Sequence, residues 1–380
     1  MTNRVGKTIS LGLTIVTVFG VVVLSATASV RAAKPLDDFT ARLSLHVKRN
    51  STSGPVGLSP ATIKSVYNLT NAGDGTGTIA IVDAYDSPTI QGDLNIFSTQ
   101  FGLPQCNTAN PCFEKHQMTN HINVNSGWAL EASLDVEWAH AIAPGAKVLL
   151  VEAKSASGSD LLNAVNYARN RADVVAVSMS WGSGEFSSEA INDSYFTSTR
   201  GAAFFASSGD SGTGAEWPAV SPNVIGVGGT SLSLAADGTL LSETAWSGSG
   251  GGVSRYESMP GYQTTYGVLG TNGKRAVPDV SYNADPASGV AVYDSTRYSG
   301  MSGWFQVGGT SAGAPQWAAT KALGHNVYNN ALYQDAKLSN AASFLRDITA
   351  GTNGACGVIC TATGGYDTVT GLGSPLTTEF

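Results

Sequence analysis

Charged residues are scarce in this chain: they make up 13% of its 380 residues, about half of the quarter that is usual in a soluble protein. Acidic residues outnumber basic ones, which gives a formal net charge of -7, and no run of Lys or Arg interrupts the sequence. This balance argues against a nucleic acid or an anionic membrane as a partner. Apolar residues reach 42% and glycines number 45, so we expect a large folded core rather than disorder.

The N-terminal 33 residues have the order of a secretory signal peptide. Arg4 and Lys7 precede an apolar run over 9–24 and small residues at 25–28. We therefore expect cleavage after Ala28 or Ala32, a secreted protein, and no stable membrane association after cleavage. The alternative is an uncleaved membrane anchor, for which the apolar run is somewhat shorter than the ~20 residues of a spanning helix.

Cysteines are also few, and they form two close pairs in loops rich in Gly, Pro or Asn. The pairs are Cys106 with Cys112 and Cys356 with Cys360. Neither pair has the spacing and neighbouring histidines of a zinc site. Because export permits disulfides, we expect two local disulfide bonds.

Apolar strand-like runs alternate with helix-like runs along the chain. The strand-like runs cover 78–82, 147–152, 174–178 and 202–206, and the helix-like runs cover 91–101, 128–142 and 160–171. Unbroken apolar strands separated by helices predict a mainly parallel sheet with helices on both faces. Ligands bind beyond the carboxyl ends of such strands, where Asp83, Ser180, Trp181 and the segment 207–210 stand.

The sharpest local motif is GGTSAGAP at 308–315, followed by a helix-like run over 316–323. Ser311 lies at the entrance to this helix, where the helix dipole and free backbone amides can serve a reacting hydroxyl. The alternative is a glycine-rich turn whose serine only caps the helix.

The sequence offers no suitable base for Ser311 among His116, His121, His140 and His325. An α/β-hydrolase needs an acid and then a histidine after the serine, and only His325 follows, in or just beyond the same helix. A subtilisin-type triad would start at Asp83, but the sequences around His116, His121 and His140 do not fit its histidine. An esterase that uses His325 is an alternative that the substitution His325→Ala would test.

A pair of carboxyl groups stands between Asp83 and Ser311 instead. Glu131 and Asp135 are one helical turn apart, and their neighbours over 128–142 are apolar nearly all round, which predicts a buried helix. Two buried like charges destabilise each other, so one should hold a proton at moderately acid pH. Such a pair is suited to accepting a proton from a serine hydroxyl at low pH.

Together these motifs resemble the sedolisins, the serine-carboxyl peptidases with a subtilisin-like α/β fold and a Ser-Glu-Asp triad. The resemblance implies a mainly parallel sheet of seven strands, with Ser311 as nucleophile, Glu131 as general base and Asp135 as its partner. The SSGDSG segment at 207–212 resembles the one that carries the oxyanion-hole aspartate, which implies this role for Asp210. A carboxyl group can donate to an oxyanion only while it is protonated.

Two further positions are placed at the site by the same resemblance. Trp181 matches a position that borders the active site in some members, and Asp83 stands where a glutamate can extend the acid network. The alternative for Asp83 is a strand-end aspartate that caps a turn.

The C-terminal part resembles the calcium site of the family. The implied ligands of one structural Ca²⁺ are the side chains of Asp347 and Asp367 and the carbonyls of Ile348, Thr363 and Gly365. Two carboxylates and several carbonyl oxygens are ligands that a hard cation takes.

The resemblance covers about 55–375, so we assign the peptidase domain to 55–380. Sedolisins usually have a large folded pro-domain, whereas 34–54 is too short to build a core of its own. The chain is then expected to fold without a pro-domain, to receive one in trans, or to be inactive. We expect a secreted, monomeric, acid-acting endopeptidase that cleaves proteins or peptides; the alternative is a non-catalytic relative that binds them.

Overall fold

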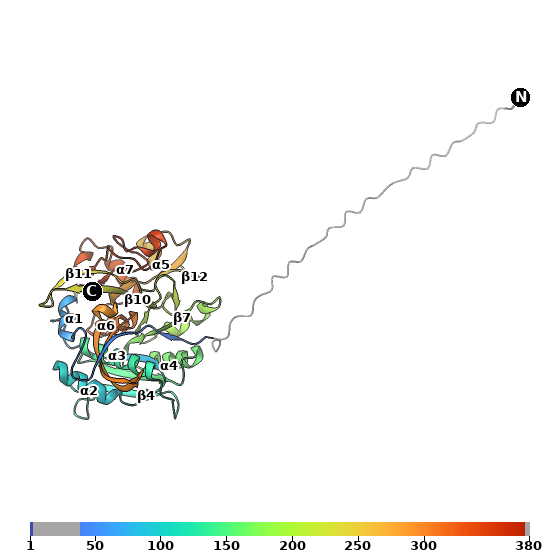
Figure 1. Cartoon of the computed structure of the whole chain (residues 1–380). Helices are drawn as coiled ribbons and strands as arrows, with labels where there is room; N and C mark the ends of the chain where they lie inside the picture. The colour runs from blue at the N-terminus through green and yellow to red at the C-terminus, as the bar shows by residue number, and fades with distance from the viewer. Residues whose placement is uncertain (3–38, 377–380) are drawn as a thin grey trace. The chain divides into compact units, whose positions relative to one another are not determined.

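The computed structural model describes residues 1–2 and 39–376, and the described residues from 39 onward form one compact unit (Figure 1). The signal peptide predicted at 1–33 lies outside the described residues except for its first two. The domain boundary predicted at Pro55 falls inside the compact unit. Within the described ranges, no helix combines the length and apolar character that a membrane crossing requires.

A parallel sheet forms the centre of this unit, as the sequence predicts. Seven of its strands in the described part are joined by parallel pairing, and the eighth, β11, is antiparallel to β10. The order is β11 (Leu240–Ala245), β10 (Ile225–Leu234), β8 (Ala203–Ser207), β6 (Val174–Met179), β3 (Thr78–Ala84), β5 (Lys147–Ala153) and β4 (Phe113–Gln117), with β14 (Val280–Asn283) also paired to β10.

Helices cover both faces of the sheet, which confirms the predicted fold class. Because side chains alternate along a strand, Ile79 and Ile81 of β3 belong to one core while Ala80 and Val82 belong to the other. The first core packs against α2 (Ile90–Phe101), α3 (Ser126–Ile142) and α6 (Gly313–Ala322), and the second against α4 (Gly158–Asn170).

The helix α3 runs through the interior, and local chemistry sets where it begins. The side chain of Asn125 accepts hydrogen bonds from the amides of Gly127 and Trp128, which satisfies donors that have no partner inside the helix. Every residue from Trp128 to Ile142 is buried, as its apolar surroundings predict. This position carries Glu131 and Asp135 into the core.

The segment 39–51 belongs to the fold through strand pairing. Its strand β1 (Arg42–Leu43) pairs with β7, and β2 (His46–Ser51) pairs with β16. The chain from β16 leads directly into the turn that holds Ser311. The partner strands are β7 (Trp181–Gly184), which also pairs with β9 (Glu216–Trp217), and β16 (Met301–Gly308), which also pairs with β15 (Val290–Tyr298).

Several elements mark the two ends of the unit. Figure 1 shows α2, α3, α4 and β4 at one end and α5, α7, β11 and β12 at the other. The fold also contains α1 (Pro60–Val66), β12 (Gly252–Ser258), α5 (Gly261–Tyr266), β13 (Lys274–Val277), α7 (Asn329–Asp335), β17 (Leu345–Arg346), β18 (Ser374–Pro375) and 3-10 turns at Glu189–Phe196, Pro286–Ser288, Ala341–Ser343 and Gly357–Cys360.

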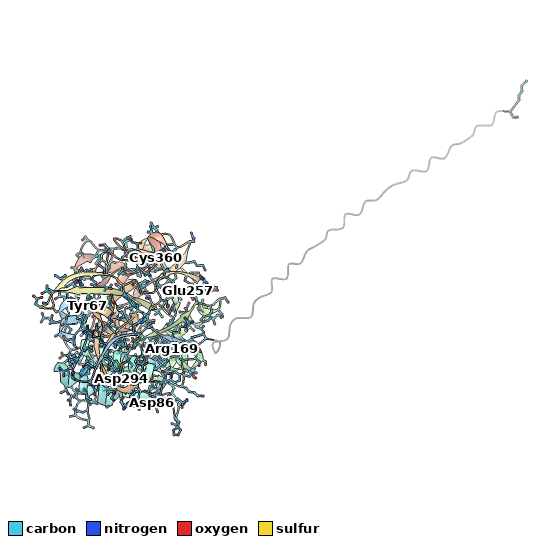
Figure 2. The ribbon with its side chains drawn as sticks, in the orientation of Figure 1. Tyr67, Asp86, Arg169, Glu257, Asp294 and Cys360 are labelled. Carbon is cyan, nitrogen blue, oxygen red and sulfur yellow. A yellow bond between two sulfur atoms is a disulfide. The ribbon has the colours of Figure 1, made fainter. Side chains whose placement is uncertain are left out.

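Both predicted disulfides are present. Cys106 is bonded to Cys112 and Cys356 to Cys360, and Figure 2 shows Cys360 at the end of the unit opposite Asp86. The first bond closes the loop before β4, and the second closes the turn before the loop at 361–370. Each bond is therefore a local staple of an exposed connection, as the close spacing of the cysteines predicts.

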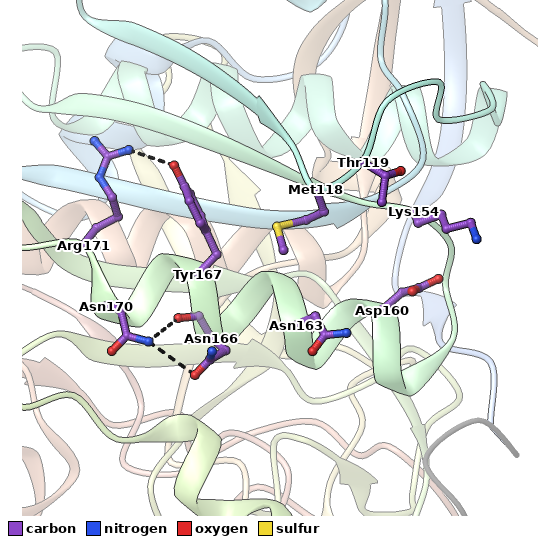
Figure 3. A pocket seen from close by; sticks show the side chains of 9 residues that line it. All are labelled: Met118, Thr119, Lys154, Asp160, Asn163, Asn166, Tyr167, Asn170 and Arg171. Atoms are coloured by element: carbon purple, nitrogen blue, oxygen red, sulfur yellow. Dashed lines mark hydrogen bonds between the residues drawn. The ribbon is translucent and has the colours of Figure 1, made fainter.

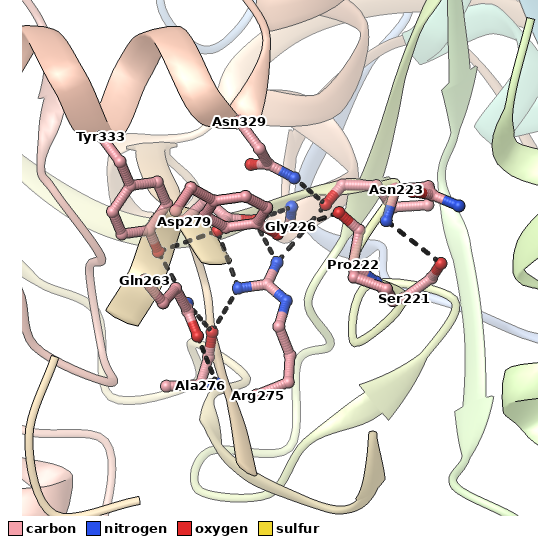
Figure 4. A network of polar contacts seen from close by, with 12 residues as sticks. Ser221, Pro222, Asn223, Gly226, Gln263, Arg275, Ala276, Asp279, Asn329 and Tyr333 are labelled. Carbon is pink, nitrogen blue, oxygen red and sulfur yellow. Dashed lines mark hydrogen bonds and ion pairs between the residues drawn. The ribbon is translucent and has the colours of Figure 1, made fainter. Parts of the chain in front are cut away.

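A buried ion pair joins β13 to the segment before β14. The guanidinium of Arg275 donates to both carboxylate oxygens of Asp279, at 2.8 Å and 2.5 Å, and both side chains are fully buried (Figure 4). Asp279 also accepts from the Tyr333 hydroxyl at 2.9 Å and from the Gly226 amide at 2.8 Å. The aspartate of the PDV segment at 278–280 is therefore part of the fold's interior.

Candidate active site

Ser311 lies in the turn Thr310–Ala312, between the end of β16 and the start of α6. Its hydroxyl donates to the carbonyl oxygen of Ser180 at 3.3 Å, and its amide donates to the carbonyl oxygen of Ser44 at 3.2 Å. The side chain is fully buried. The helix entrance therefore presents both a hydroxyl and a backbone donor, as the motif predicts.

The predicted acid pair lies next to this hydroxyl. Glu131 and Asp135 are both fully buried on α3. Burial first, and then the charge of Asp83, raise the pKa of Glu131 well above its usual range, while a contact with Ser311 favours the ionised form. The structure therefore places the predicted base near the nucleophile, although among the described residues neither carboxylate oxygen of Glu131 makes a hydrogen bond.

Asp135 is tied to the same centre through a serine. Burial, followed by the charges of Asp83 and Glu131, raises the pKa of Asp135 well above its usual range. The hydroxyl of Ser180 donates to Asp135 Oδ1 at 2.9 Å and also lies 3.3 Å from the Ser311 carbonyl oxygen. Ser180 thus links the second acid to the backbone of the nucleophile.

Asp83 extends the carboxyl cluster along the sheet. It is buried at the end of β3, opposite Glu152 of β5, and burial together with the charge of Glu152 raises the pKa of Asp83 to about 8. The ammonium of Lys115 lies 3.1 Å from Glu152 Oε1. Sequence reasoning missed Glu152 and Lys115; the signal for Glu152 was a second acid at the end of a buried apolar strand.

Trp181 borders the site without joining the carboxyl cluster. Its indole N–H donates to the carbonyl oxygen of Val82 at 2.8 Å, next to Asp83 in the chain. The ring is fully buried and lies 6.1 Å from the ring of Trp217. Trp181 therefore supports the end of β3 through a backbone contact.

Asp210 contacts the turn that holds Ser311, through Thr310, and is separate from the carboxyl cluster of Asp83, Glu131 and Asp135. Its Oδ1 accepts from the amide and the hydroxyl of Thr310, both at 2.8 Å, and its Oδ2 lies 3.2 Å from His46 Nε2. The nearby carboxylate raises the pKa of His46, which is half-buried. The predicted oxyanion residue is thus held beside Ser311, and its partner His46 was missed by sequence reasoning.

Three other histidines make contacts away from Ser311 within the described residues. His140 Nε2 lies 2.8 Å from the carbonyl oxygen of Pro104, and the ring of His116 stacks on Tyr167 at 3.8 Å. His325 follows the end of α6, and its carbonyl oxygen accepts from Lys321. In this part of the chain, no hydrogen bond of Ser311 reaches a histidine.

A surface hollow of about 550 Å³ lies along α4, away from the carboxyl cluster. Figure 3 shows Lys154 and Asp160 at one end of it and Tyr167 and Arg171 at the other. None of the predicted catalytic residues lines this hollow, so the reacting groups are not in it.

The five predicted calcium ligands lie in two loops that meet. The amide of Gly365 donates to Asp347 Oδ2 at 2.8 Å, and the amide of Thr363 donates to Asp367 Oδ2 at 3.0 Å. Ile348 follows Asp347 directly. Both carboxylates are thus directed at one short loop, and this set of oxygen donors fits a hard cation. Among the described residues, the one cluster of three His and Cys ligands contains disulfide-bonded Cys106 and Cys112.

The sheet, the serine at a helix entrance and the buried carboxyl pair define a protein of the subtilisin-like class. Residues 106–357 match the model of the subtilase family. The chain belongs to the subtilase family.

Relatives and a solved structure narrow this assignment. The chain is 32% identical over 371 residues to kumamolisin of Bacillus sp. (strain MN-32), covering 86% of this chain and 64% of the relative. It is 28% identical over 358 residues to sedolisin of Pseudomonas sp. (strain 101), covering 84% and 60%. The structure of Pseudomonas sedolisin, a serine-carboxyl proteinase complexed with pseudo-iodotyrostatin, matches with a TM-score of 0.70 and 26% identity, covering 86% and 96%.

These matches confirm the predicted resemblance to the sedolisins. The chain spans less than two thirds of the length of the two curated relatives, at 64% and 60%.

Proposed function

We propose that this chain is a serine-carboxyl endopeptidase that hydrolyses peptide bonds in proteins at acid pH. The observation that carries the proposal is the convergence of Ser311, Glu131 and Asp135 in one buried cluster, with Asp210 on the far side of the serine. Among the described residues, no hydrogen bond joins Ser311 to a histidine.

In the first step, Ser311 Oγ attacks the carbonyl carbon of the peptide while its proton passes to Glu131. Burial keeps the pKa of Glu131 high, so the carboxylate, once ionised, is a stronger base than an exposed glutamate. The neighbouring Asp135 can hold the proton of the pair, because two adjacent buried carboxyl groups do not ionise together. Glu131 then returns the proton to the leaving nitrogen.

The developing oxyanion would be met by two donors. One is the backbone amide of Ser311, and the other is the carboxyl of Asp210, which lies beside Thr310. Asp210 can donate only in its protonated form, so acid conditions favour this function. The shared proton of the acid pair is the source of the pH requirement that the buried carboxyl groups support.

A structural calcium ion is part of this proposal. The carboxylates of Asp347 and Asp367, with carbonyls of Ile348, Thr363 and Gly365, would hold it beside the closed loop of the second disulfide. Bound there, the ion neutralises the two carboxylates and ties the loop after β17 to the loop before β18.

The setting of the enzyme follows from its composition. A signal-like N-terminus, two disulfides and a surface poor in charge are together typical of an exported protein. We infer secretion, action as a monomer on protein or peptide substrates, and no nucleic-acid or stable membrane partner.

The decisive experiment is a pH-rate profile on a denatured protein, comparing the chain with Ser311→Ala and Glu131→Gln. We expect activity at acid pH, abolished by Ser311→Ala and lowered about 10²–10⁴-fold by Glu131→Gln, the usual contribution of a positioned general base. The matched control is Glu137→Gln: Glu137 is equally buried on α3 but accepts from the Tyr293 amide, so activity should persist. An optimum near neutral pH that survives Glu131→Gln would exclude this triad, and a folded, calcium-loaded chain without activity would favour a non-catalytic peptide binder.

Removal of calcium tests the metal site separately. Chelation should lower the unfolding temperature of the chain, because an ion that binds only the folded state at 100 times its Kd adds about 2.7 kcal/mol to the free energy of unfolding. The variant Asp347→Asn should show a smaller response to added calcium. An unfolding temperature that is unchanged by chelator would contradict the site.

A further inference from the structure

The segment 39–44 lies in the site as an extended chain held on both sides. On one side the Ala41 amide donates to the Ala156 carbonyl oxygen at 2.8 Å, and the Gly158 amide donates to the Phe39 carbonyl oxygen at 3.3 Å. On the other side β1 pairs antiparallel with β7. An added strand bound through its backbone is a common way to bind a peptide.

This extended chain carries one carbonyl group to the nucleophile. Directly after β1, the carbonyl oxygen of Ser44 accepts the backbone amide of Ser311 at 3.2 Å. That amide is the donor placed above at the developing oxyanion, and it belongs to the same residue as the attacking hydroxyl. The carbonyl of Ser44 thus occupies the position expected for a peptide bond that will react.

After Ser44, the chain continues past the nucleophile as a bound substrate would continue beyond its reacting bond. After Leu45, His46 places its ring nitrogen 3.2 Å from Asp210 Oδ2, and β2 then runs along β16. The backbone beside the nucleophile is shaped for this approach: a Cβ on Gly309 would lie 2.0 Å from the Ser44 carbonyl oxygen and 2.5 Å from Asp210 Oδ2.

The side chains of Ser44 and Phe39, which precede the peptide bond to Leu45, pack in enclosed positions. Ser44 is 3% exposed, with its hydroxyl 3.3 Å from that of Ser207, so the position next to the carbonyl accepts a small side chain. Further back, the ring of Phe39 lies 5.2 Å from that of Trp217 and 5.5 Å from that of Phe186. The contacts of the residues before and after Ser44 therefore hold its carbonyl group in place.

We propose that the peptide bond between Ser44 and Leu45 is cleaved by Ser311 of the same chain. The proposal rests on the proposed peptidase function and adds a processing site and a preference for a small residue before the reacting bond. Until cleavage, the segment 39–51 fills the site and excludes other substrates.

The step follows the peptidase chemistry. The bond from Ser311 Oγ to the Ser44 carbonyl carbon forms while the Oγ proton passes to Glu131. The carbon–nitrogen bond to Leu45 then breaks, and its nitrogen takes that proton to become a new N-terminal amine. Water adds to the acyl carbon, which frees Ser44 as a carboxylic acid and returns a proton to Ser311 Oγ.

The test maps the N-termini of the purified full chain by mass spectrometry and sequencing after transfer to acid pH. We expect a product that begins at Leu45, formed with a half-time that does not change on dilution, and none from Ser311→Ala. Hydrolysis of a denatured protein is measured on the same samples. If that protein is cleaved while the chain stays intact or is cut elsewhere, this inference is overturned and the peptidase function stands; if neither is cleaved, both are overturned.

A pair of proline variants tests the position of the bond. Leu45→Pro should abolish the product, because the ring adds carbon atoms to the nitrogen that must take the proton. Ser53→Pro places the same residue at an exposed position beyond β2, and cleavage should continue. Cleavage after residue 44 in folded Leu45→Pro would overturn the inference; if this variant does not fold, the N-terminus of the unaltered chain decides.

Discussion

At the scale of single residues, the site depends on where carboxyl groups are buried. Glu131 and Asp135 share a helix, and Asp83 faces them from β3. Burial raises the pKa of all three, and the charge of Asp83 raises the other two further. A cluster of this kind holds protons that exposed carboxyl groups would lose, which suits it to proton transfer in acid.

Gly309 lies in the turn before Ser311, where the backbone leaves no room for a side chain. Gly309 has φ 113°, and a Cβ there would overlap the Ser44 carbonyl oxygen. Gly309→Ala should lower the free energy of unfolding by well over ~1 kcal/mol, since strain from the positive φ is joined by a steric clash. It should also displace the segment 39–51, measured as faster tryptic cleavage at Arg42.

The control for this prediction is Gly300→Ala. Gly300 has a similar positive φ, 81°, but a Cβ there meets nothing within 4 Å, so it reports the backbone strain alone. Equal losses of stability in the two variants, with unchanged tryptic cleavage, would contradict the close approach of Ser44 to Gly309.

Sequence reasoning proposed site residues where the sequence signal is local. The Ser311 motif and the spacing of Glu131 and Asp135 are each contained within one helix turn or helix entrance, so the structure brings them together as expected. Ser44 and His46 were missed because they reach the site by pairing with strands far along the chain. Pairing between distant segments leaves no periodic trace in a single sequence.

At the scale of elements, the buried strands and helices were predicted well. The apolar runs at 78–82 and 147–152 are β3 and β5, and the apolar helix around Glu131 is α3. The hairpin of β15 and β16 and the strand β2 were not predicted, because each mixes polar with apolar residues and only part of the hairpin is buried. Unbroken apolar runs are thus readable, whereas half-exposed strands are not.

The junction of β13 and β14 gives a prediction about an element. Arg275→Met should lower the free energy of unfolding by about 3–5 kcal/mol, because it leaves the buried carboxylate of Asp279 without its cation. The control Arg171→Met removes a guanidinium that pairs with Glu114 and Asp173, which are 30% and 43% exposed, and surface pairs of this kind should cost about 1 kcal/mol or less each. Denaturant unfolding measures both.

A double variant checks the origin of that loss. Arg275→Met combined with Asp279→Asn removes both charges, so it should be less destabilised than the sum of the single variants. Strict additivity would show that the loss comes from packing rather than from the ion pair.

At the scale of the whole molecule, buried acids set how stability changes with pH. The folded pKa values of Asp83, Glu189 and Asp294 are raised to about 8, about 9 and about 7, in each case mainly by burial. The folded state therefore binds more protons than the unfolded state above pH ~4. This stabilising effect is complete below the unfolded pKa values and is lost as pH rises through the folded ones.

We therefore predict that the unfolding temperature falls between pH 4 and pH 8. Each kcal/mol lost lowers the unfolding temperature by roughly 2–4 °C in domains of about 150–250 residues, so the shift should be smaller in this larger unit, and Asp83→Asn should flatten the profile. Scanning calorimetry at constant ionic strength and calcium measures this. An unfolding temperature that rises across the window would contradict the buried, protonated state of these acids.

The docking of 39–44 uses mainly backbone atoms: amides and carbonyls of Phe39, Ala41 and Ser44, and the pairing of β1 with β7. The side chain of Arg42 points outward and is exposed. Peptide groups are common to all residues except for the missing amide hydrogen of proline. Natural selection can therefore vary the exposed side chains at 40 and 42 without moving the segment from its place against Ser311, whereas Phe39, Ala41 and Ser44 are buried and constrained in size.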